Sequence, residues 1–302
     1  MGTAHQLISL SKHPKISIVT PSFNQAAYLE QTILSVLDQN YPNLEYIIID
    51  AGSTDESVDI IQKYSDRLTY WTSEPDTGMY HALQKGMART TGDIMGWLNS
   101  DDMLHKNALY NVAEILSLPG VNWIQGQPSH FDEQGRTVNV FPSAPWSKYR
   151  YIMQDYEWIQ QESTYWTRDL WESAGAYIST EYKYAGDMEL WNRFFRHEKL
   201  YTPACLIGGF RVRQKEQASL EGMDTYRQES ISILNANVPS VVEQQTLKKI
   251  KNVNNKLRWI YRSKLLALPF FTSSLQQQKQ QLFDFPATIQ FNRKEQKYYL
   301  TS

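Results

Sequence analysis

The sequence predicts an α/β fold with a mostly parallel mixed sheet flanked by helices. In the first third of the chain, short runs of Ile and Val alternate with segments whose apolar residues recur at helical spacing. Strands and helices that alternate with short connections form parallel sheets with helices on both faces. Three of the strands end in small polar and acidic residues, and ligands bind outside the carboxyl ends of parallel strands. We therefore expect one binding site at that edge of the sheet.

Four strands and three helices are expected before residue 105. The strands cover residues 15–20, 46–49, 68–72 and 94–98, and the helices cover residues 24–39, 53–64 and 77–89. Asn24 is expected to cap the first helix, and Ser53 and Glu56 fit a capping box at the start of the second. The polar loops that follow the first, second and fourth strands are expected to converge.

The chain changes character after residue 105. We expect a hairpin between residues 121–125 and 137–141, strands over 161–167 and 200–210, and helices over 168–174 and 185–197. From about residue 219 the pattern is helical and polar. The predicted organisation is an N-terminal tail (1–14), an α/β domain (15–220, with halves 15–105 and 106–220) and a helical C-terminal extension (221–302).

Composition excludes several classes of protein. The chain has 302 residues and a formal net charge of −2, so no basic field indicates a nucleic-acid partner. Cys205 is the single cysteine, which excludes a disulfide framework and suits a reducing compartment. No apolar run is long enough to cross a bilayer, and residues 1–14 lack the apolar stretch of a signal peptide. We therefore expect a cytoplasmic protein.

Two adjacent carboxylates, Asp101 and Asp102, follow the buried strand that ends at Leu98. Burying them is costly unless a cation compensates their charge. Mg²⁺ typically takes one or two carboxylates together with substrate phosphates, so a metal that holds a diphosphate would explain the pair. The alternative is an ordinary turn in which Asp102 caps the next helix. The pair alone favours the turn, and the motifs around it favour the metal site.

Asp187 and Glu189 lie in the first turn of the helix expected over residues 185–197. The helix dipole stabilises acidic residues at this position, and that explanation is sufficient for Asp187 taken alone. A catalytic role is favoured only when this segment is considered together with the motifs upstream.

Five motifs occur in a specific order. They cover residues 18–24, 49–55, 76–80 with 84–86, 98–102 and 186–191. Each is weak by itself, but in this order and spacing they resemble the family 2 glycosyltransferases, a large inverting family with the GT-A fold. The resemblance covers roughly residues 14–220. It implies a Rossmann-like GT-A domain with a nucleotide-binding half over 15–105 and an acceptor-binding half over 106–220.

The resemblance also implies a role for each matching residue. Asp187 would be the general base, with Glu189 as the weaker candidate. Asp101 would bind Mn²⁺ or Mg²⁺, with Asp102 as a secondary candidate. The residues implied in binding the nucleotide sugar are Pro21, Ser22, Phe23, Asn24, Asp50, Gly52, Ser53, Asp76, Lys85, Asn99, Ser100 and Arg213. An ionised carboxylate only accepts hydrogen bonds, so Asp50 would accept one from the base or its ribose.

The chemistry of sugar transfer needs these groups. A departing nucleoside diphosphate carries negative charge that a metal neutralises. The attacking acceptor hydroxyl must lose its proton, which calls for one positioned carboxylate. A single base without a covalent intermediate implies inversion at the anomeric carbon.

Three positions depart from the family pattern. Asn99 replaces the first acid of the metal motif, and Ala51 follows Asp50 where the family often has a second Asp. Arg213 stands where a His is frequent; it cannot ligate a metal but could hold a diphosphate in a bidentate way. These departures keep open a degenerate GT-A module that binds sugar or nucleotide without turnover.

The expected function is that of a metal-dependent, inverting hexosyl- or N-acetylhexosaminyl-transferase. It would move a sugar from a nucleotide-sugar donor, expected to be UDP-linked, to a hydroxyl of a glycan or lipid-linked acceptor in surface polysaccharide synthesis. A sugar-phosphate nucleotidyltransferase has less support, because the loop at residues 21–24 is not Gly-rich and lacks Arg. A P-loop kinase is excluded, because its phosphate-binding motif is absent.

Residues 247–268 form a basic segment in which Lys and Arg are interleaved with Trp and Leu. A helix of this composition can lie on an anionic membrane surface, here the inner face of the plasma membrane. Peripheral membrane contact would bring the protein to a lipid-linked acceptor. An equally good explanation is a solvated helix packed on the catalytic domain, and the sequence leaves both open.

Overall fold

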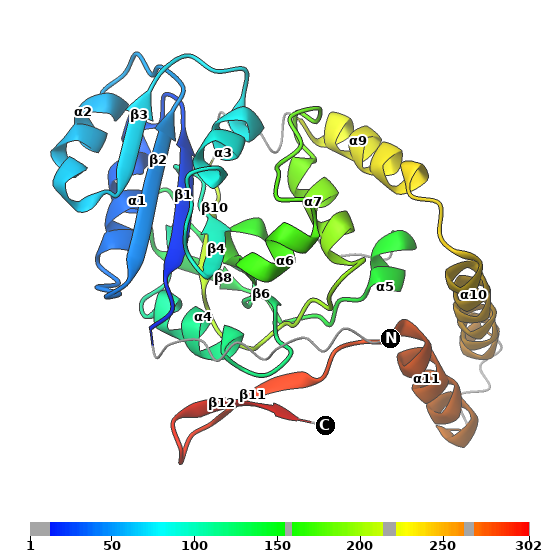
Figure 1. Ribbon diagram of the computed structural model, residues 1–302. Coiled ribbons are helices and arrows are strands. Elements are labelled where there is room, and N and C mark those ends of the chain that lie inside the picture. The colour runs from blue at the N-terminus through cyan, green and yellow to red at the C-terminus, as the bar shows by residue number, and fades with distance from the viewer. Residues whose placement is uncertain (1–12, 155–158, 214–221, 263–268, 302) are drawn as a thin grey trace.

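The computed structural model describes residues 13–154, 159–213, 222–262 and 269–301 (Figure 1). A six-stranded sheet forms its centre, with strand order β3-β2-β1-β4-β9-β6. The predicted α/β fold with a mostly parallel mixed sheet is thereby confirmed. The strands of this sheet are β1 (Ile16–Ser22), β2 (Leu44–Asp50), β3 (Tyr70–Ser73), β4 (Ile94–Trp97), β6 (Trp123–Gln125) and β9 (Thr164–Thr167).

The direction of strand addition reverses beside β1. Strands β1, β2 and β3 pair in parallel, and the chain then returns to the other side of β1, where β4 also pairs in parallel. Strand β9 is antiparallel to both β4 and β6, which makes the sheet mixed. The carboxyl ends of β1 and β4 therefore border the topological switch point, where open α/β sheets bind their ligands.

Helices cover both faces of the sheet, and each face has its own apolar core (Figure 1). One face carries α1 (Ala26–Leu37), α2 (Ser57–Lys63) and α4 (Ala108–Leu116). The other carries α3 (Met79–Met87), α6 (Arg168–Ser173) and α7 (Gly186–Phe194). Successive residues of a strand point to opposite faces, so β2 supplies both cores. Strands buried on both faces are continuous apolar runs, which is why the sequence predicts them well.

Four tryptophans tie the sheet to α7. The rings of Trp97 in β4 and Trp191 in α7 are nearly parallel, with centroids 5.7 Å apart. Trp166 packs edge-on against Trp97 at 5.6 Å, and Trp123 lies 5.5 Å from Trp191. All four rings are almost fully buried. Such large aromatic contacts dominate core energetics, so they hold α7 in a fixed position against β4.

A second sheet lies beside the carboxyl edge of the first. Its order is β5 (Met103–Leu104), β10 (Gly208–Arg211), β7 (Ser129–Phe131) and β8 (Thr137–Val140). The predicted hairpin partner of residues 137–141 is wrong, because β8 pairs with β7 and β6 belongs to the central sheet. The strand expected over 200–210 is likewise confined to β10. Short apolar runs show where a strand lies but not which strand it pairs with.

The predicted helix caps are also wrong. Asn24 has a positive φ of 50° and precedes the N-cap position of α1, which Gln25 occupies without a side-chain cap. Helix α2 begins after Glu56 rather than after Ser53. Asn107, not Asp102, holds the N-cap position of α4. Asn and Ser serve turns as readily as caps, and here they pin loops of the site together.

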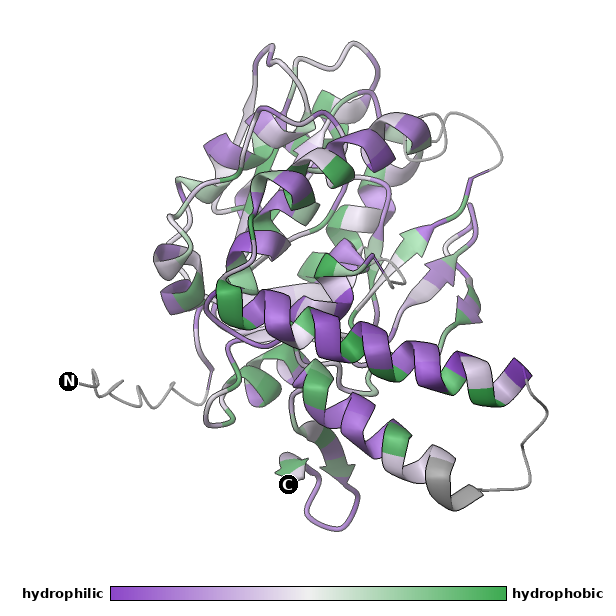
Figure 2. Cartoon of the chain, turned by 90° about the vertical axis from the view of Figure 1, so that its right-hand side faces the viewer, coloured by the Kyte–Doolittle hydropathy of each residue, from purple (hydrophilic) through white to green (hydrophobic). Residues whose placement is uncertain are grey.

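The C-terminal part contains more than helices. Helices α9 (Met223–Ala236), α10 (Val241–Arg262) and α11 (Pro269–Phe283) are followed by a hairpin of β11 (Thr288–Asn292) and β12 (Lys297–Thr301). Helix α9 packs on α7, and α10 lies beside α11 on the outside of the molecule (Figure 2). The remaining short elements are η1 (Ser65–Arg67), α5 (Lys148–Ile152) and η2 (Gln161–Ser163). Within the described ranges, no helix combines the length and apolar character needed to cross a membrane.

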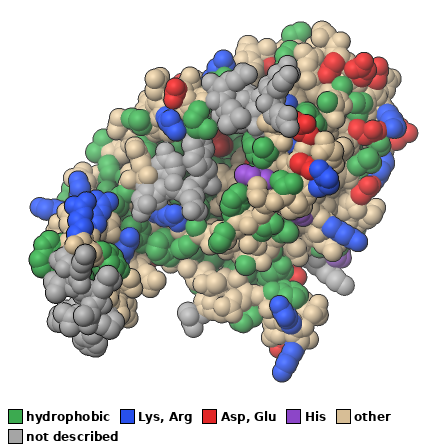
Figure 3. Space-filling view, turned by 180° about the vertical axis from the view of Figure 1, so that it is seen from behind, with side chains coloured by type: hydrophobic (Ala, Val, Ile, Leu, Met, Phe, Trp, Pro, Cys, Tyr) green, Lys and Arg blue, Asp and Glu red, His purple; other side chains and the backbone are tan. Residues whose placement is uncertain are grey.

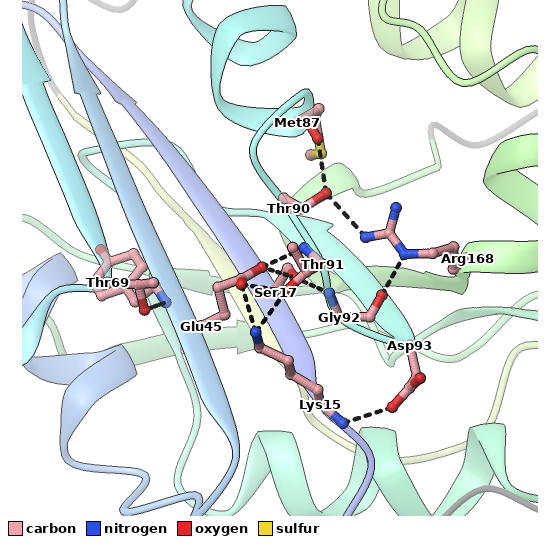
Figure 4. Close-up of polar contacts among 11 residues, drawn as sticks. Lys15, Ser17, Glu45, Thr69, Met87, Thr90, Thr91, Gly92, Asp93 and Arg168 are labelled. Carbon is pink, nitrogen blue, oxygen red and sulfur yellow. Dashed lines mark hydrogen bonds and ion pairs between the residues drawn. The ribbon is translucent and has the colours of Figure 1, made fainter.

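A buried carboxylate network joins the amino ends of β1, β2 and β4 (Figure 4). Glu45 is 3% exposed and pairs with Lys15, whose Nζ lies 2.7 Å from Glu45 Oε1. Ser17 Oγ donates to Glu45 Oε2 at 2.5 Å, and Thr91 donates through its N–H and its hydroxyl at 2.6 and 2.7 Å. Burial alone would raise the pKa of Glu45, but these hydrogen bonds together lower it to about 2.

This network predicts a pH-dependent contribution to stability. The pKa of folded Glu45 is below its ordinary value, so the stabilisation is complete above about pH 4.5 and is lost as the pH falls towards 2. Glu45→Gln should lower the free energy of unfolding at pH 7 by about 1–3 kcal/mol and flatten its fall between pH 5 and pH 3. Urea unfolding at several pH values measures both effects.

Glu30→Gln is the matched control. The Glu30 side chain is 42% exposed and pairs with Lys63 at the surface, so the substitution should cost less than about 1 kcal/mol. Equal losses for the two variants would show that the Glu45 network has no special weight.

Candidate functional site

A cavity of about 1600 Å³ opens at the switch point of the central sheet. Its walls come from the ends of β1 and β4, the start of α3, the second sheet, the segment 141–146, the start of α7 and the start of α9. Nine predicted site residues line it: Pro21, Ser22, Phe23, Asp76, Asn99, Ser100, Asp101, Asp187 and Arg213. The other seven are not among its lining residues: Asn24, Asp50, Gly52, Ser53, Lys85, Asp102 and Glu189.

Asp50 lies at the end of β2, fully buried, and its carboxylate shapes the loop that follows. Oδ2 accepts from the N–H groups of Gly52 (3.1 Å) and Ser53 (2.9 Å) and from the Ser73 hydroxyl (2.7 Å). Oδ1 accepts from the Ser53 hydroxyl at 2.6 Å. Gly52 has a φ of +77°, which glycine adopts without strain. The direct contact between Asp50 and a nucleotide stays a prediction, since the protein itself supplies these four hydrogen bonds.

Asn24 connects the first two loops of the site. Its N–H donates to Ser53 Oγ at 2.8 Å, and its Oδ1 accepts from the N–H of Thr54 at 2.9 Å. Asn24 thereby links the loop after β1 to the loop after β2. The neighbouring Phe23 is 56% exposed and lines the cavity, where a planar ring can stack on it.

Asp101 faces the cavity and forms an ion pair with Arg213. Arg213 Nη2 lies 2.8 Å from Asp101 Oδ2, and the two side chains are 9% and 15% exposed respectively. Burial raises the pKa of Asp101, and the Arg213 guanidinium opposes this shift. The residue predicted as a metal ligand is therefore already paired with a cation from the chain itself.

Asp102 is fully buried behind Asp101 and holds the second sheet in place. Its Oδ1 accepts from the N–H of Arg211 at 2.8 Å, and its Oδ2 accepts from Asn99 Nδ2 at 3.1 Å. Burial, followed by the charges of Asp101 and Glu162, raises the pKa of Asp102 well above its ordinary value. Asp102 does not line the cavity, so its contacts favour a structural role over that of a second metal ligand.

The residues at the end of β4 can accommodate a divalent ion. Asn99 lines the cavity, and its Oδ1 is buried and has no hydrogen-bond partner among the described residues. An amide oxygen beside a carboxylate is a suitable pair of hard ligands for Mg²⁺ or Mn²⁺, which complete their shells with water and phosphate oxygens. In the part of the chain that the structure describes, no three His, Cys, Asp or Glu side chains gather as a metal site. Substrate would have to supply much of the coordination.

Asp187 lies in the first turn of α7 with one carboxylate oxygen held. Oδ1 accepts from the N–H of Met188 at 2.8 Å and from the Tyr80 hydroxyl at 3.3 Å. Desolvation by burial raises the pKa of Asp187 to about 6, although these hydrogen bonds oppose the shift. A carboxylate of this kind is ionised at neutral pH and is a stronger base than an exposed Asp.

Helix α9 braces the segment that leads into Asp187. Glu229 of α9 accepts from the N–H groups of Lys183, Tyr184 and Ala185, each at 2.9 Å. Gly222, Met223 and Tyr226 at the start of α9 also line the cavity. The site therefore extends past residue 220, where the sequence places the end of the domain.

Glu189 and Lys85 are engaged elsewhere. Glu189 receives two hydrogen bonds from Arg193 Nε, at 2.9 and 3.1 Å, and one from Nη2 at 2.8 Å. Lys85 pairs with Glu74 at 2.8 Å. Neither lines the cavity, so Asp187 is the stronger candidate for the base.

Sequence reasoning missed two residues of the cavity wall. Glu162 in η2 is 4% exposed, and its Oε1 has no hydrogen-bond partner among the described residues. Burial raises the pKa of Glu162 to about 8, so its carboxyl group is protonated at neutral pH. Tyr80 lies in α3, as the sequence predicts, and its hydroxyl also contacts the main-chain oxygen of Tyr184 at 2.8 Å and Asp187 Oδ1 at 3.3 Å. The one local signal was the polar run Gln160–Glu162 before an apolar strand.

Comparison with known proteins identifies the family. The family model described as glycosyl transferase family 2 matches residues 17–170, half of the chain. The chain belongs to this family. TuaG, a putative teichuronic acid biosynthesis glycosyltransferase of Bacillus subtilis, is 38% identical over 106 residues, which are 34% of this chain and 42% of TuaG. An uncharacterized glycosyltransferase of Haemophilus influenzae is 31% identical over 144 residues, 47% of this chain and 58% of that protein.

Solved structures show the same fold at low sequence identity. The crystal structure of Staphylococcus aureus TarS 1–349 in complex with UDP-GlcNAc is 18% identical, with a TM-score of 0.61 over 77% of this chain and 70% of that one. The mannosyltransferase PcManGT from Pyrobaculum calidifontis, in complex with GDP-Man and Mn²⁺, is 16% identical, with a TM-score of 0.60 over 89% of this chain and 84% of that one. The GT-A fold predicted from the sequence is thereby confirmed.

The contact between Gly186 and Tyr80 predicts a specific packing defect. A Cβ atom on Gly186 would lie 2.8 Å from the Tyr80 ring. Helix propensity alone favours Gly186→Ala by up to about 1 kcal/mol, but overpacking a core typically costs about 1–3 kcal/mol. We expect net destabilisation in thermal and urea unfolding. In a Tyr80→Ala background the same substitution should become neutral or stabilising; an equal loss in both backgrounds would contradict the ring contact as the cause.

Proposed function

We propose that the protein transfers a sugar from a nucleotide-sugar donor to a hydroxyl group of an acceptor, with inversion at the anomeric carbon. The observation that carries this proposal is the presence of Asp187 and Asp101 on the wall of one cavity at the switch point. The neighbours in complex with UDP-GlcNAc and GDP-Man support a nucleotide-sugar donor, and a UDP-linked sugar remains our expectation. The name of TuaG supports a polysaccharide acceptor.

Asp187 is proposed as the general base. It removes the proton of the acceptor hydroxyl as the oxygen bonds to the anomeric carbon and the diphosphate departs. Its pKa of about 6 leaves it ionised at neutral pH, whereas Glu162, with a pKa of about 8, retains its proton. Only one of these two cavity carboxyls can therefore accept a proton at pH 7. One base without a covalent intermediate leads to inversion.

Asp101 and Asn99 are proposed to hold Mn²⁺ or Mg²⁺ at the donor diphosphate. The ion supplies charge neutralisation to the leaving group. The Mn²⁺ complex of a neighbour supports this assignment. Phe23, together with Pro21 and Ser22, is proposed to wall the nucleotide. The transferred group is proposed to be a hexosyl or N-acetylhexosaminyl group, because the product would be a glycan and the cavity is large enough to hold such a sugar.

The competing functions have less support. A sugar-phosphate nucleotidyltransferase is disfavoured by membership of family 2. A degenerate module without turnover would account for Asn99 and Arg213. It would not account for the raised pKa of Asp187 beside the cavity, because a module that only binds a ligand needs no such base.

The outer face of α10 is proposed as a contact for an anionic membrane surface. Ile250, Val253 and Leu257 face the protein, and Trp259, on the opposite side, is 65% exposed. Figure 3 shows Lys and Arg side chains gathered with apolar ones at this end of the molecule. Six cations of α10 are exposed and form no ion pair with a described residue: Lys248, Lys249, Lys251, Lys256, Arg258 and Arg262.

The arrangement of these side chains on α10 favours contact with a lipid surface over a helix face that is exposed only to water. Lys256 and Arg262 lie three residues to either side of Trp259, so the ring has a cation on the neighbouring turn in both directions. Basic residues that flank an exposed Trp suit the boundary between headgroups and acyl chains. Residues 263–268 of the basic segment lie outside the described residues.

Asp187→Asn tests the proposed reaction. It should lower turnover by roughly 10²- to 10⁴-fold and leave the affinity for a nucleoside diphosphate unchanged. In the wild type, kcat/KM should fall below about pH 6 as Asp187 takes up a proton, and NMR should show a product with inverted anomeric configuration. Glu189→Gln is the control: it breaks the contact with Arg193 but should leave the acid limb of the pH profile in place. Near-normal turnover by Asp187→Asn, or retention of configuration, would refute the assignment.

Vesicle flotation tests the membrane contact. The wild type should float with vesicles containing phosphatidylglycerol and not with pure phosphatidylcholine. Reversing two charges in Lys256→Glu/Arg262→Glu should weaken binding by roughly 30-fold or more, since each Lys or Arg near an anionic surface is worth about 1 kcal/mol. Lys294→Glu/Lys297→Glu makes the same change of net charge on the C-terminal hairpin and should bind normally. Equal weakening by both pairs would leave only a net-charge effect and remove α10 as the contact.

A further inference from the structure

Two arginines approach the acidic end of β4 from β10 and its continuation, and they are held in different ways. Arg211 is fully buried, and main-chain oxygens fix it: Nε donates to Asp101 O at 2.5 Å, and Nη1 donates to Asp132 O and Glu133 O at 3.2 and 3.0 Å. These contacts make it a structural element of the second sheet.

Among the described residues, Arg213 has only side-chain partners. Its Nη2 pairs with Asp101, its Nη1 makes a long contact of 3.4 Å with Gln25 Oε1, and its guanidinium carbon lies 5.3 Å from the centroid of the Tyr28 ring. Its Nε is buried and has no hydrogen-bond partner among the described residues. An unsatisfied donor on a charged group in a buried setting is costly. The guanidinium therefore retains donor capacity at the wall of the cavity.

The position of Arg213 matters because its partner Asp101 is a proposed metal ligand. Its carboxylate faces the same cavity as the unpartnered Asn99 Oδ1, and these two oxygens are the proposed metal ligands. A divalent ion bound to the Asp101 carboxylate would lie close to the guanidinium, which is 2.8 Å from Oδ2, and the two cations would repel each other in this buried setting. The ion pair therefore opposes metal binding.

The guanidinium is also well suited to a diphosphate. Its planar fork matches the oxygens of a phosphate group and can form two parallel hydrogen bonds, which an ammonium group cannot. Without ligands, Arg213 balances the charge of Asp101. When a metal binds Asp101 and a diphosphate enters the cavity, the metal adds positive charge and the diphosphate adds negative charge. The buried charges therefore stay compensated.

We propose that Arg213 is a resident counter-ion of Asp101 that a divalent metal displaces, and that the displaced guanidinium then binds the donor diphosphate. This inference rests on the proposed metal site and deepens it by assigning Arg213 as the residue that links metal binding to donor binding. The metal alone binds weakly, because it must break a buried ion pair. Metal and nucleotide together bind with positive coupling, because the nucleotide receives the released arginine.

Titration of Mn²⁺ into the protein without nucleotide, followed by electron paramagnetic resonance, tests the competition. Arg213→Gln should bind Mn²⁺ roughly tenfold more tightly than the wild type, since the competing cation is gone. Asp101→Asn should lose this binding in either background. Arg136→Gln is the matched control; the Arg136 side chain is 75% exposed, and neither it nor its partner Asp132 lines the cavity, so Mn²⁺ affinity should not change. Thermal unfolding of each variant verifies that the fold is retained.

Titration of UDP and GDP at saturating Mn²⁺, by calorimetry, tests the second half. The nucleotide that the wild type binds should bind roughly tenfold or more weakly to Arg213→Gln, while Arg213→Lys should recover only part of the loss. Arg213→Gln thus moves metal affinity and nucleotide affinity in opposite directions, which the loss of a merely structural arginine would not do.

Several outcomes would overturn the inference. They are an Mn²⁺ affinity that Arg213→Gln leaves unchanged or lowers, a nucleotide affinity that it leaves unchanged, and an absence of Mn²⁺ binding by every variant. Sugar transfer is measured separately. If Arg213→Gln does not change the two affinities as expected but the wild type transfers sugar, the inference fails and the proposed function stands. If the affinities change as expected but the wild type transfers no sugar, the protein is a nucleotide-binding module with this counter-ion.

Discussion

Compensation of buried negative charge at the end of β4 is the constraint on which the site depends. Asp101, Asp102 and Glu162 all lie there with little exposure to water, and carboxylates without compensation are not tolerated in such a setting. The charge of each carboxyl group is compensated or avoided in a different way. Asp102 accepts hydrogen bonds from Arg211 and Asn99, Glu162 retains its proton, and Asp101 pairs with Arg213. Strand β10 of the second sheet and the residues that follow it bring Arg211 and Arg213 to the end of β4.

Stability and function occupy opposite ends of the same strands. At the amino ends of β1 and β2, Glu45 is satisfied by Lys15, Ser17 and Thr91, and its pKa is lowered. At the carboxyl end of β4 and the start of α7, Asp101 and Asp187 have raised pKa values, and the nearby Asn99 Oδ1 has no hydrogen-bond partner among the described residues. The first arrangement stabilises the charged state through the fold. The second leaves interactions for a ligand to complete, which is the usual signature of a binding or catalytic site.

The position of Asp187 relative to Asp101 depends on aromatic packing and on polar contacts from α9. Trp97 and Trp191 stack across the interface between β4 and α7, and Trp166 closes the cluster from β9. Glu229 then fixes the segment before Asp187 from α9. Helix α9 thus contributes to the cavity wall, while α10 and α11 lie further out and α10 exposes basic side chains.

The sequence by itself determined the features that arise from local pattern. Continuous apolar runs predict the buried parallel strands and place Asp101 at their carboxyl edge, and the order of five short motifs predicts the family. It could not predict features that depend on which segments meet in space. Examples are the pairing of β8 with β7 rather than with β6, the hydrogen bond from Ser73 to Asp50, the burial of Glu162 and the ion pair between Arg213 and Asp101. Only tertiary structure decided these, because burial and charge pairing are properties of the assembled core, whereas periodicity is a property of the chain.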